Sequence, residues 1–171
     1  MGYAGVEFAR GYEELPVEQV KKALDDAGVK AVSAHVALDF MEQDLPYLAK
    51  LGVKFVACPM APFNTAEEAK ELAEDLNKFG QMAKQYGITI GYHNHTGEFY
   101  QDQGKYLMDY LIENTDPETV AFETQIASSS WTPSGRKLGL PQPLRLRKQC
   151  QGMLQRVLLE CSTPDSSSEG C

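Results

Sequence analysis

The stretch "YGITIGYHNH", residues 86–95, contains the pattern from which the fold can be predicted. A glycine follows a helical segment, a short apolar strand follows the glycine, and polar side chains stand where the strand ends. The same order recurs in "AGVKAVSAHV" (residues 27–36) and "LGVKFVACPM" (residues 51–60), with the three glycines 24 and 35 residues apart. Such spacings are typical of units that contain one strand and one helix. The opening "AGVEFA" (residues 4–9) has the same form, so we expect the chain to start partway through the repeat.

Short apolar segments with β-branched residues predict five strands, and their composition favours a covered parallel sheet. The predicted strands are residues 6–9, 31–36, 54–59, 89–93 and 119–123. Apolar residues at helical spacing predict helices over residues 17–27, 45–51, 66–86 and 105–114. Thr65 and Glu68 form a capping box before the third helix, and Gly87 follows its last apolar residue.

Repeated strand–helix units close into a (β/α)₈ barrel or form an open doubly wound sheet. No glycine-rich phosphate-binding motif follows a strand, so nucleotide-binding versions of the open sheet lack support. In a barrel the carboxyl ends of the strands form one rim, where active sites lie. Polar side chains stand near these ends at Glu7, His35, His93, His95, Glu98 and Glu123. The sequence therefore predicts an α/β fold that is part of a TIM barrel.

Composition changes after Glu123 and predicts two parts. Residues 1–123 carry a net charge of −11, whereas residues 124–171 carry +3. The second part is rich in Ser, Pro, Gln and Arg, which favours disorder, although residues 144–160 could form one amphipathic helix. We expect either a charged interaction tail or the product of a shifted reading frame.

The whole chain excludes several classes of protein. Its 171 residues carry a net charge of −8, which argues against a general nucleic-acid binder. No apolar run approaches the roughly 18 residues of a membrane span. The first ten residues lack the pattern of a secretory signal peptide. We therefore expect a cytoplasmic protein without membrane partners.

His93 and His95 are the most specific candidates for chemistry. Residues two apart in a strand point the same way, about 6–7 Å apart, so these histidines share a side and Asn94 points away. Imidazoles beside the carboxylate of Glu98 suit a divalent transition metal, and they suit acid–base catalysis equally well. A metal usually needs three or four protein ligands, so carboxylates from other strand ends would have to contribute. Alternatively, the histidines are polar turn residues that bond to backbone carbonyls.

The segment "GYHNHTGEF", residues 91–99, resembles the Y-H-N-H-x-x-E-F signature of sugar phosphate isomerase/epimerase-like proteins. These proteins belong to the superfamily of xylose-isomerase-like TIM barrels. Residues 2–9 and 65–88 look like the same family in the same order, and the resemblance covers residues 1–123. It implies a barrel with a divalent metal (Mn, Co, Mg or Zn) at its carboxyl-end rim. The implied reaction is proton transfer on a sugar, sugar phosphate or inositol derivative.

Matched residue by residue, the resemblance implies a role for each strand-end side chain. His93 and Glu123 are expected to be catalytic, and His95 and Glu98 are expected to bind the metal. Three further residues are expected to contact the substrate: His35, Glu7 and Tyr92.

The resemblance ends inside the last predicted strand. The family pattern there reads F-E-L-D, whereas this sequence reads "AFETQ", with Gln125 in place of an Asp ligand. A later His-x-Lys-Asp strand and a final Glu ligand are missing, so about strands two to six of eight are expected. The alternatives are an inert fragment that self-associates through open sheet edges, or a partner-binding module. A DNA endonuclease of the same superfamily is disfavoured by the charge of −11 on residues 1–123.

Overall fold

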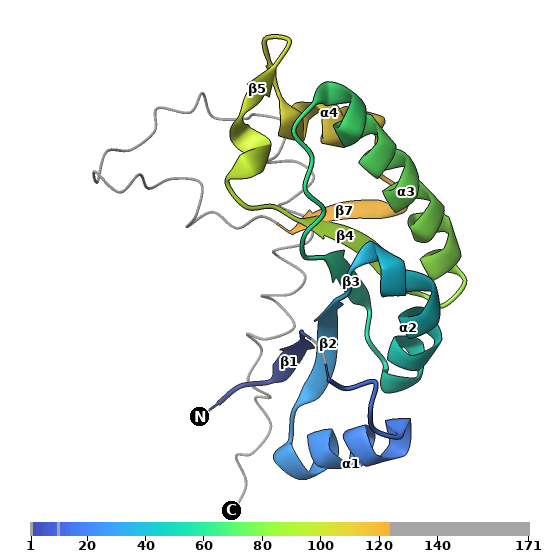
Figure 1. The fold of residues 1–171 in the computed structure, drawn as a ribbon. Helices are drawn as coiled ribbons and strands as arrows, with labels where there is room; N and C mark the ends of the chain where they lie inside the picture. The colour runs from blue at the N-terminus through green and yellow to red at the C-terminus, as the bar shows by residue number, and fades with distance from the viewer. Residues whose placement is uncertain (1, 10, 124–171) are drawn as a thin grey trace, which may run out of the picture.

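Five parallel strands form the centre of the computed structural model, which describes residues 2–9 and 11–123 (Figure 1). In spatial order they are β1 (Gly5–Phe8), β2 (Lys30–His35), β3 (Phe55–Cys58), β4 (Thr89–His93) and β7 (Val120–Glu123). Every neighbouring pair is parallel. The five predicted strands are confirmed, each within one residue at either end.

Four helices connect these strands and lie along one side of the sheet (Figure 1). They are α1 (Val17–Ala27), α2 (Leu38–Leu51), α3 (Ala66–Lys84) and α4 (Leu107–Asn114). The spatial order of the strands follows the chain without reversal, whereas a doubly wound sheet reverses and has helices on both faces. The described residues therefore form part of a TIM barrel, as the sequence predicted.

The recurring glycines end helices, as their position in the repeat indicates. Gly28 and Gly52 follow α1 and α2 with φ angles of 67° and 91°. This left-handed conformation suits glycine because it has no Cβ, and it turns the chain directly into the next strand.

The second helix is longer than the sequence predicted. It begins at Leu38 rather than at residue 45, so Pro46 lies inside it. Proline removes one helical hydrogen bond, so its position inside a helix is costly. Met41, Leu45 and Leu48 are fully buried on one side of the helix, and this packing outweighs the lost bond.

The segment between β4 and α4 contains elements that the sequence analysis missed. A short 3₁₀ helix, η1 (Gly97–Phe99), precedes a hairpin of β5 (Gln101–Asp102) and β6 (Lys105–Tyr106). Helix α4 therefore begins at Leu107, two residues after the start that the sequence predicted. The carboxylate of Asp102 accepts a hydrogen bond from the Ala66 N–H at 2.8 Å, which ties the hairpin to the start of α3.

Helix α3 begins where the capping pattern predicts. The Glu68 N–H donates to Thr65 Oγ1 at 3.2 Å, and the Glu68 carboxylate accepts from the Asn64 N–H at 2.6 Å. The helix ends at Lys84, two residues before the predicted end.

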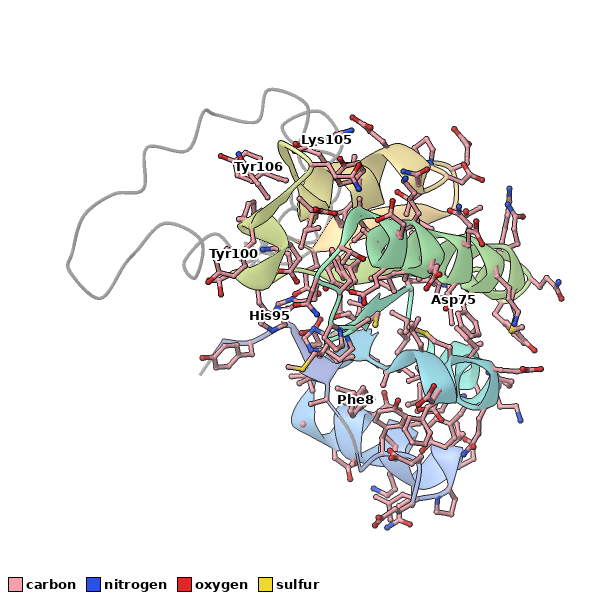
Figure 2. All side chains as sticks on the ribbon, turned by 45° about the horizontal axis from the view of Figure 1, so that its top comes forward. Phe8, Asp75, His95, Tyr100, Lys105 and Tyr106 are labelled. Carbon is pink, nitrogen blue, oxygen red and sulfur yellow. The ribbon has the colours of Figure 1, made fainter. Side chains whose placement is uncertain are left out.

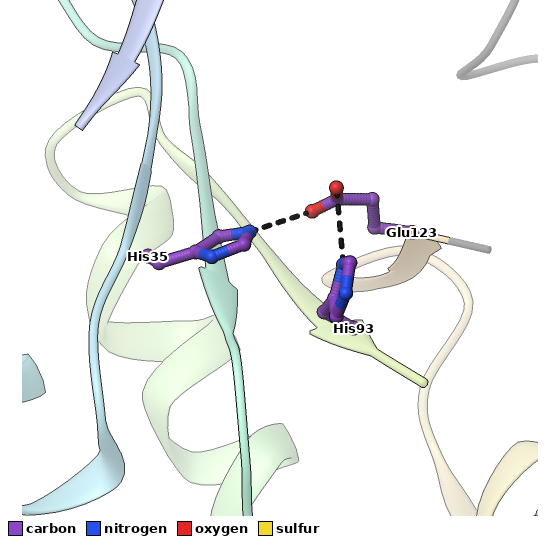
Figure 3. Close-up of side chains that lie close together, drawn as sticks. All are labelled: His35, His93 and Glu123. Carbon is purple, nitrogen blue, oxygen red and sulfur yellow. Dashed lines mark hydrogen bonds and ion pairs between the residues drawn. The ribbon is translucent and has the colours of Figure 1, made fainter. Parts of the chain in front are cut away.

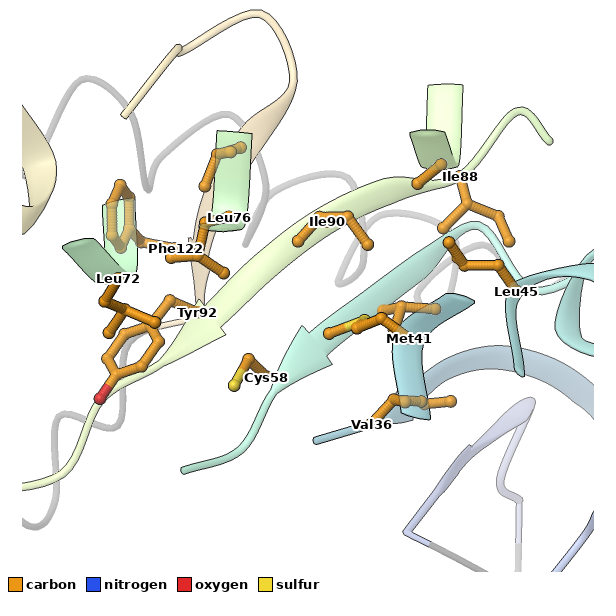
Figure 4. Packing of buried hydrophobic residues seen from close by; sticks show 14 of the residues in the cluster. Val36, Met41, Leu45, Cys58, Leu72, Leu76, Ile88, Ile90, Tyr92 and Phe122 are labelled. Atoms are coloured by element: carbon orange, nitrogen blue, oxygen red, sulfur yellow. The ribbon is translucent and has the colours of Figure 1, made fainter. Parts of the chain in front are cut away.

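The hydrophobic core lies between the sheet and the helices (Figure 4). Ile90, Tyr92, Cys58 and Phe122 point from the strands towards the helical layer, and all four are buried. Because side chains alternate along a strand, the intervening residues of β4 and β7 point to the opposite face of the sheet. His93 and Glu123 are among these residues.

The predictions for residues 124–171, including the helix over 144–160 and the comparison at Gln125, lie outside the described residues. Among the helices that the structure describes, none is long and apolar enough to cross a membrane.

Candidate functional site

Four polar side chains from four strands meet at the carboxyl end of the sheet. Glu7 comes from β1, His35 from β2, His93 from β4 and Glu123 from β7. Figure 3 shows His35 and His93 converging on the carboxylate of Glu123. This is the end of a barrel at which active sites occur.

The distances in this cluster are those of direct contact. His35 Nε2 lies 3.3 Å from Glu123 Oε2 and 3.3 Å from Glu7 Oε1. His93 Nδ1 lies 3.1 Å from Glu123 Oε1, and the rings of His35 and His93 are 4.9 Å apart between centroids. Glu123 therefore contacts both histidines, one through each oxygen.

Strand register explains why these residues meet. His93 pairs directly with Glu123 across β4 and β7. His35 and His93 are separated by β3, where Ala57 pairs with His35. Gly91 pairs with Ala57 from the other side. Ala57 on the intervening strand and Gly91 on β4 are small, and they leave room for the two imidazoles to approach each other.

The cluster shifts the acid–base equilibria of its own members. The hydrogen bond to Glu123 raises the pKa of His35, the negative charges of Glu7 and Glu123 act in the same direction, and burial opposes them. The same hydrogen bond lowers the pKa of Glu123; the two imidazoles add to this effect, and burial opposes it. Glu123 is therefore ionised at neutral pH, and His35 holds a proton more readily than a free imidazole.

The donor set suits a divalent metal ion. His35, His93 and Glu123 each offer a ligand atom, and these atoms all lie within 4.8 Å of one another. His93 Nδ1 is buried and makes no well-directed hydrogen bond within the described residues, although a carboxylate oxygen is close. Two imidazoles and a carboxylate are ligands that Zn²⁺, Mn²⁺ and Co²⁺ accept. The residues present therefore fit the metal that the sequence resemblance implies.

His95 borders this cluster without belonging to it. Its side chain is 41% exposed, and its ring lies 5.1 Å from that of His93 between centroids. Figure 2 shows it on the side of the molecule away from Asp75 of α3. Its Nδ1 atom is 4.0 Å from Glu98 Oε1, the second predicted metal ligand. The assignment of His95 and Glu98 to the metal stays a prediction.

Two further residues of the motif, Glu98 and Tyr92, are buried. The Tyr92 hydroxyl donates to Glu98 Oε1 at 2.7 Å, and the His95 N–H donates to Glu98 Oε2 at 3.0 Å. Burial, together with the neighbouring Glu98 carboxylate, raises the pKa of Tyr92 far above its ordinary value. The predicted role of Tyr92 in substrate binding stays a prediction.

Two residues of the site were missed by sequence reasoning. The Ser33 hydroxyl donates a hydrogen bond to Glu7 Oε2, which holds that carboxylate beside His35. Ser33 stands two positions before His35 in the same strand, so the alternation of side chains could have identified it. Ala57 contributes by its small size, which leaves no signal of its own in a single sequence.

Comparison with known proteins identifies relatives of the described part. The family model described as "Xylose isomerase-like TIM barrel" matches residues 1–122. An inosose dehydratase of Mesomycoplasma hyopneumoniae is 30% identical over 144 aligned residues, covering 70% of this chain and 47% of that protein.

Solved structures show the same architecture. A sugar phosphate isomerase/epimerase from Parabacteroides distasonis superposes with a TM-score of 0.68 at 26% identity, covering 75% of this chain and 57% of that one. The IolI protein, solved with a bound zinc atom, gives a TM-score of 0.54 at 13% identity, covering 71% and 52%. At that identity the likeness concerns the fold alone. The chain spans about half the length of the relatives it matches.

Proposed function

Because the chain belongs to the xylose isomerase-like TIM barrel family, we propose that it takes part in metal-assisted proton transfer on a sugar, sugar phosphate or inositol derivative. The observation that carries this proposal is the cluster of His35, His93 and Glu123 at the rim. Relatives named inosose dehydratase and sugar phosphate isomerase/epimerase support the substrate class. Because the chain spans about half of those proteins, their activity is not carried over as a fact.

His35, His93 and Glu123 are the residues that would hold the metal, since their ligand atoms are the ones that converge. Mn²⁺, Co²⁺ and Zn²⁺ suit this donor set better than Mg²⁺, which prefers oxygen ligands. When bound, a divalent ion would polarise adjacent hydroxyl and carbonyl oxygens of a sugar, which makes the neighbouring C–H more acidic.

Proton transfer is assigned to Glu123 and His93. A base must be deprotonated at working pH, and the low pKa of Glu123 keeps its carboxylate ionised at neutral pH. A carboxylate has two oxygens, so one can contact a metal while the other accepts a proton. His93 Nδ1 lies 3.1 Å from Glu123 Oε1, close enough for the two groups to exchange a proton when no ion occupies that nitrogen.

Substrate hydroxyls are assigned to the side chains around the cluster. Glu7 and His95 offer hydrogen-bonding atoms at the same end of the sheet, and both are partly exposed. A polyol substrate with adjacent hydroxyl and carbonyl groups matches such a rim, because each hydroxyl both donates and accepts hydrogen bonds.

The metal part of the proposal is tested by calorimetric titration of the full chain with Mn²⁺ and, separately, Co²⁺. We expect His93→Ala and Glu123→Gln to weaken binding by at least about 10-fold, because each removes a ligand. His95→Ala is the matched control, since it removes a neighbouring imidazole outside the cluster. Binding that survives His93→Ala but is lost in His95→Ala and Glu98→Gln would favour the ligands predicted from the sequence.

The chemical part is tested by deuterium exchange. The chain is incubated in D₂O with a keto-inositol or a ketose, and loss of the C–H signal next to the carbonyl is followed by NMR. We expect exchange that depends on added Mn²⁺ or Co²⁺ and on Glu123. Absence of both metal binding and exchange would contradict the proposal and favour an inert fragment or a partner-binding module.

A further inference from the structure

We propose that Glu98 is a positioning residue whose buried carboxylate fixes the turn after β4, and thereby the placement of His93 and His95. In this role Glu98 binds neither metal nor substrate. The inference rests on the function proposed above, because it concerns the same site.

The contacts of Glu98 point to this role. Glu98 is 6% exposed, and each of its two carboxylate oxygens already accepts a hydrogen bond. Oε1 accepts from the Tyr92 hydroxyl and Oε2 from the His95 N–H, at 2.7 and 3.0 Å. A buried carboxylate is costly unless such bonds are made, so these partners hold it in place. Binding a metal would add a further partner to a buried carboxylate that already accepts a hydrogen bond through each of its oxygens.

The backbone of His95 is held on both of its sides. Its N–H donates to Glu98, and its carbonyl accepts from Asn94 Nδ2 at 3.0 Å. Asn94 is fully buried, and its own N–H donates to the backbone carbonyl of Glu123 at 3.4 Å. These bonds hold the turn to the core and to β7. The imidazole of His93 lies in the cluster, and that of His95 lies beside it.

The residues of the motif thus fall into two sets, one that supports the turn and one that faces the site. Tyr92, Asn94 and Glu98 are each at most 6% exposed and form the support of the turn. His93 and His95 alternate with the first two along the chain and have side chains 14% and 41% exposed. This division explains why a carboxylate stands three residues after His95 although it is not among the residues whose ligand atoms converge.

The test uses the full chain and three variants. Glu98→Gln keeps the shape of the side chain but replaces the charged carboxylate with a neutral amide, so the His95 N–H and the Tyr92 hydroxyl no longer both donate to a carboxylate oxygen. Tyr92→Phe removes one donor and leaves the carboxylate in place. Glu74→Gln makes the same chemical change at an exposed position of α3 and is the matched control.

Two measurements are made on each variant. Hydrogen exchange of the His95 amide is followed by NMR without metal, and Co²⁺ binding is followed by its visible absorption. For Glu98→Gln we expect about tenfold faster exchange of that amide, because its acceptor is weakened. We expect Co²⁺ to bind about 10- to 100-fold more weakly with its absorption bands in unchanged positions, since the ligands remain. Tyr92→Phe should act in the same direction, and Glu74→Gln should change neither quantity.

Two results would overturn the inference. One is a Glu98→Gln variant with unchanged amide exchange and unchanged Co²⁺ affinity. The other is a shift of the Co²⁺ absorption bands in Glu98→Gln but not in Tyr92→Phe, which would make Glu98 a ligand. If Glu98→Gln does not fold, Tyr92→Phe alone decides by the same two measurements. If the unmodified chain binds no Co²⁺, the proposed function fails, while the exchange of the His95 amide still tests the role of Glu98.

Discussion

Glu123 lies between two imidazoles, and the charge on His35 determines how strongly its carboxylate is held. His35 in turn contacts a second carboxylate, that of Glu7. A protonated His35 therefore links the ends of β1, β2 and β7, whereas a neutral His35 leaves the two carboxylates without this shared cation. At the scale of single residues, the site therefore has a measurable dependence on pH.

The lowered pKa of Glu123 stabilises the fold above the ordinary carboxyl value of 4.5, and this contribution is lost as pH falls through the lowered value. The raised pKa of His35 stabilises it below 6.5, and this contribution is lost as pH rises through the raised value. We predict that both contributions are present together between about pH 4.5 and 6.5. The measurement is the free energy of urea unfolding of the metal-free chain from pH 4 to 9.

His35→Gln should flatten this profile on its alkaline side, and Glu123→Gln should flatten it on both sides, because His35 loses its partner. Glu74→Gln is the control with an unchanged profile. Profiles that remain parallel in all variants would show that the pair does not contribute to stability.

Sequence reasoning could place Glu7, His35, His93 and Glu123 at strand ends, because each lies in or next to a short apolar run that predicts a strand. It could not tell which of them touch, since this depends on strand register and on the small Ala57 between the two histidines. The placement of Glu98 was equally hidden, because η1 turns its side chain inwards. Such local turns leave no periodic signal in the sequence.

Among the elements, the repeating strand–helix units were predictable because glycine, strand and helix follow one another at regular spacing. The start of α2 was predicted seven residues too late, because the packing that holds Leu38 and Met41 in the helix is not visible in the sequence. The hairpin of β5 and β6 was missed because each strand has only two residues. Element type was therefore easier to predict than element ends.

The contact between α3 and β7 supports the strand that carries Glu123. A Cβ atom at Gly80 would lie 2.9 Å from both Cβ and Oγ1 of Thr119 and 3.0 Å from its carbonyl oxygen. We predict that Gly80→Ala destabilises the chain, because overpacking costs about 1–3 kcal/mol. Because three atoms of Thr119 would lie within 3.0 Å, we expect a cost in the upper part of this range, which exceeds the gain of about 1 kcal/mol that alanine gives in a helix. Urea unfolding measures the difference.

Gly97→Ala is the matched control for Gly80→Ala, because a Cβ there meets nothing within 4 Å. If Gly80→Ala is as stable as the unmodified chain, the close packing of α3 on Thr119 is not rigid. In that case the helix does not fix the position of β7.

At the scale of the whole molecule, the described residues are a run of consecutive strand–helix units with the site along one edge. β1 and β7 each have a single neighbour in the sheet that residues 2–9 and 11–123 form. Self-association through these strands, like the division of the chain at residue 123, stays a prediction. The inosose dehydratase of Mesomycoplasma hyopneumoniae is about twice as long as the region that it shares with this chain.

We propose that His35 and His93, from two strands that are not neighbours, bind one divalent ion together with Glu123. X-ray absorption of the Co²⁺-loaded full chain at the cobalt edge counts imidazole ligands directly. We expect two imidazoles in the unmodified chain and in His95→Ala, and one in His35→Ala. An imidazole lost in His95→Ala but retained in His35→Ala would contradict it.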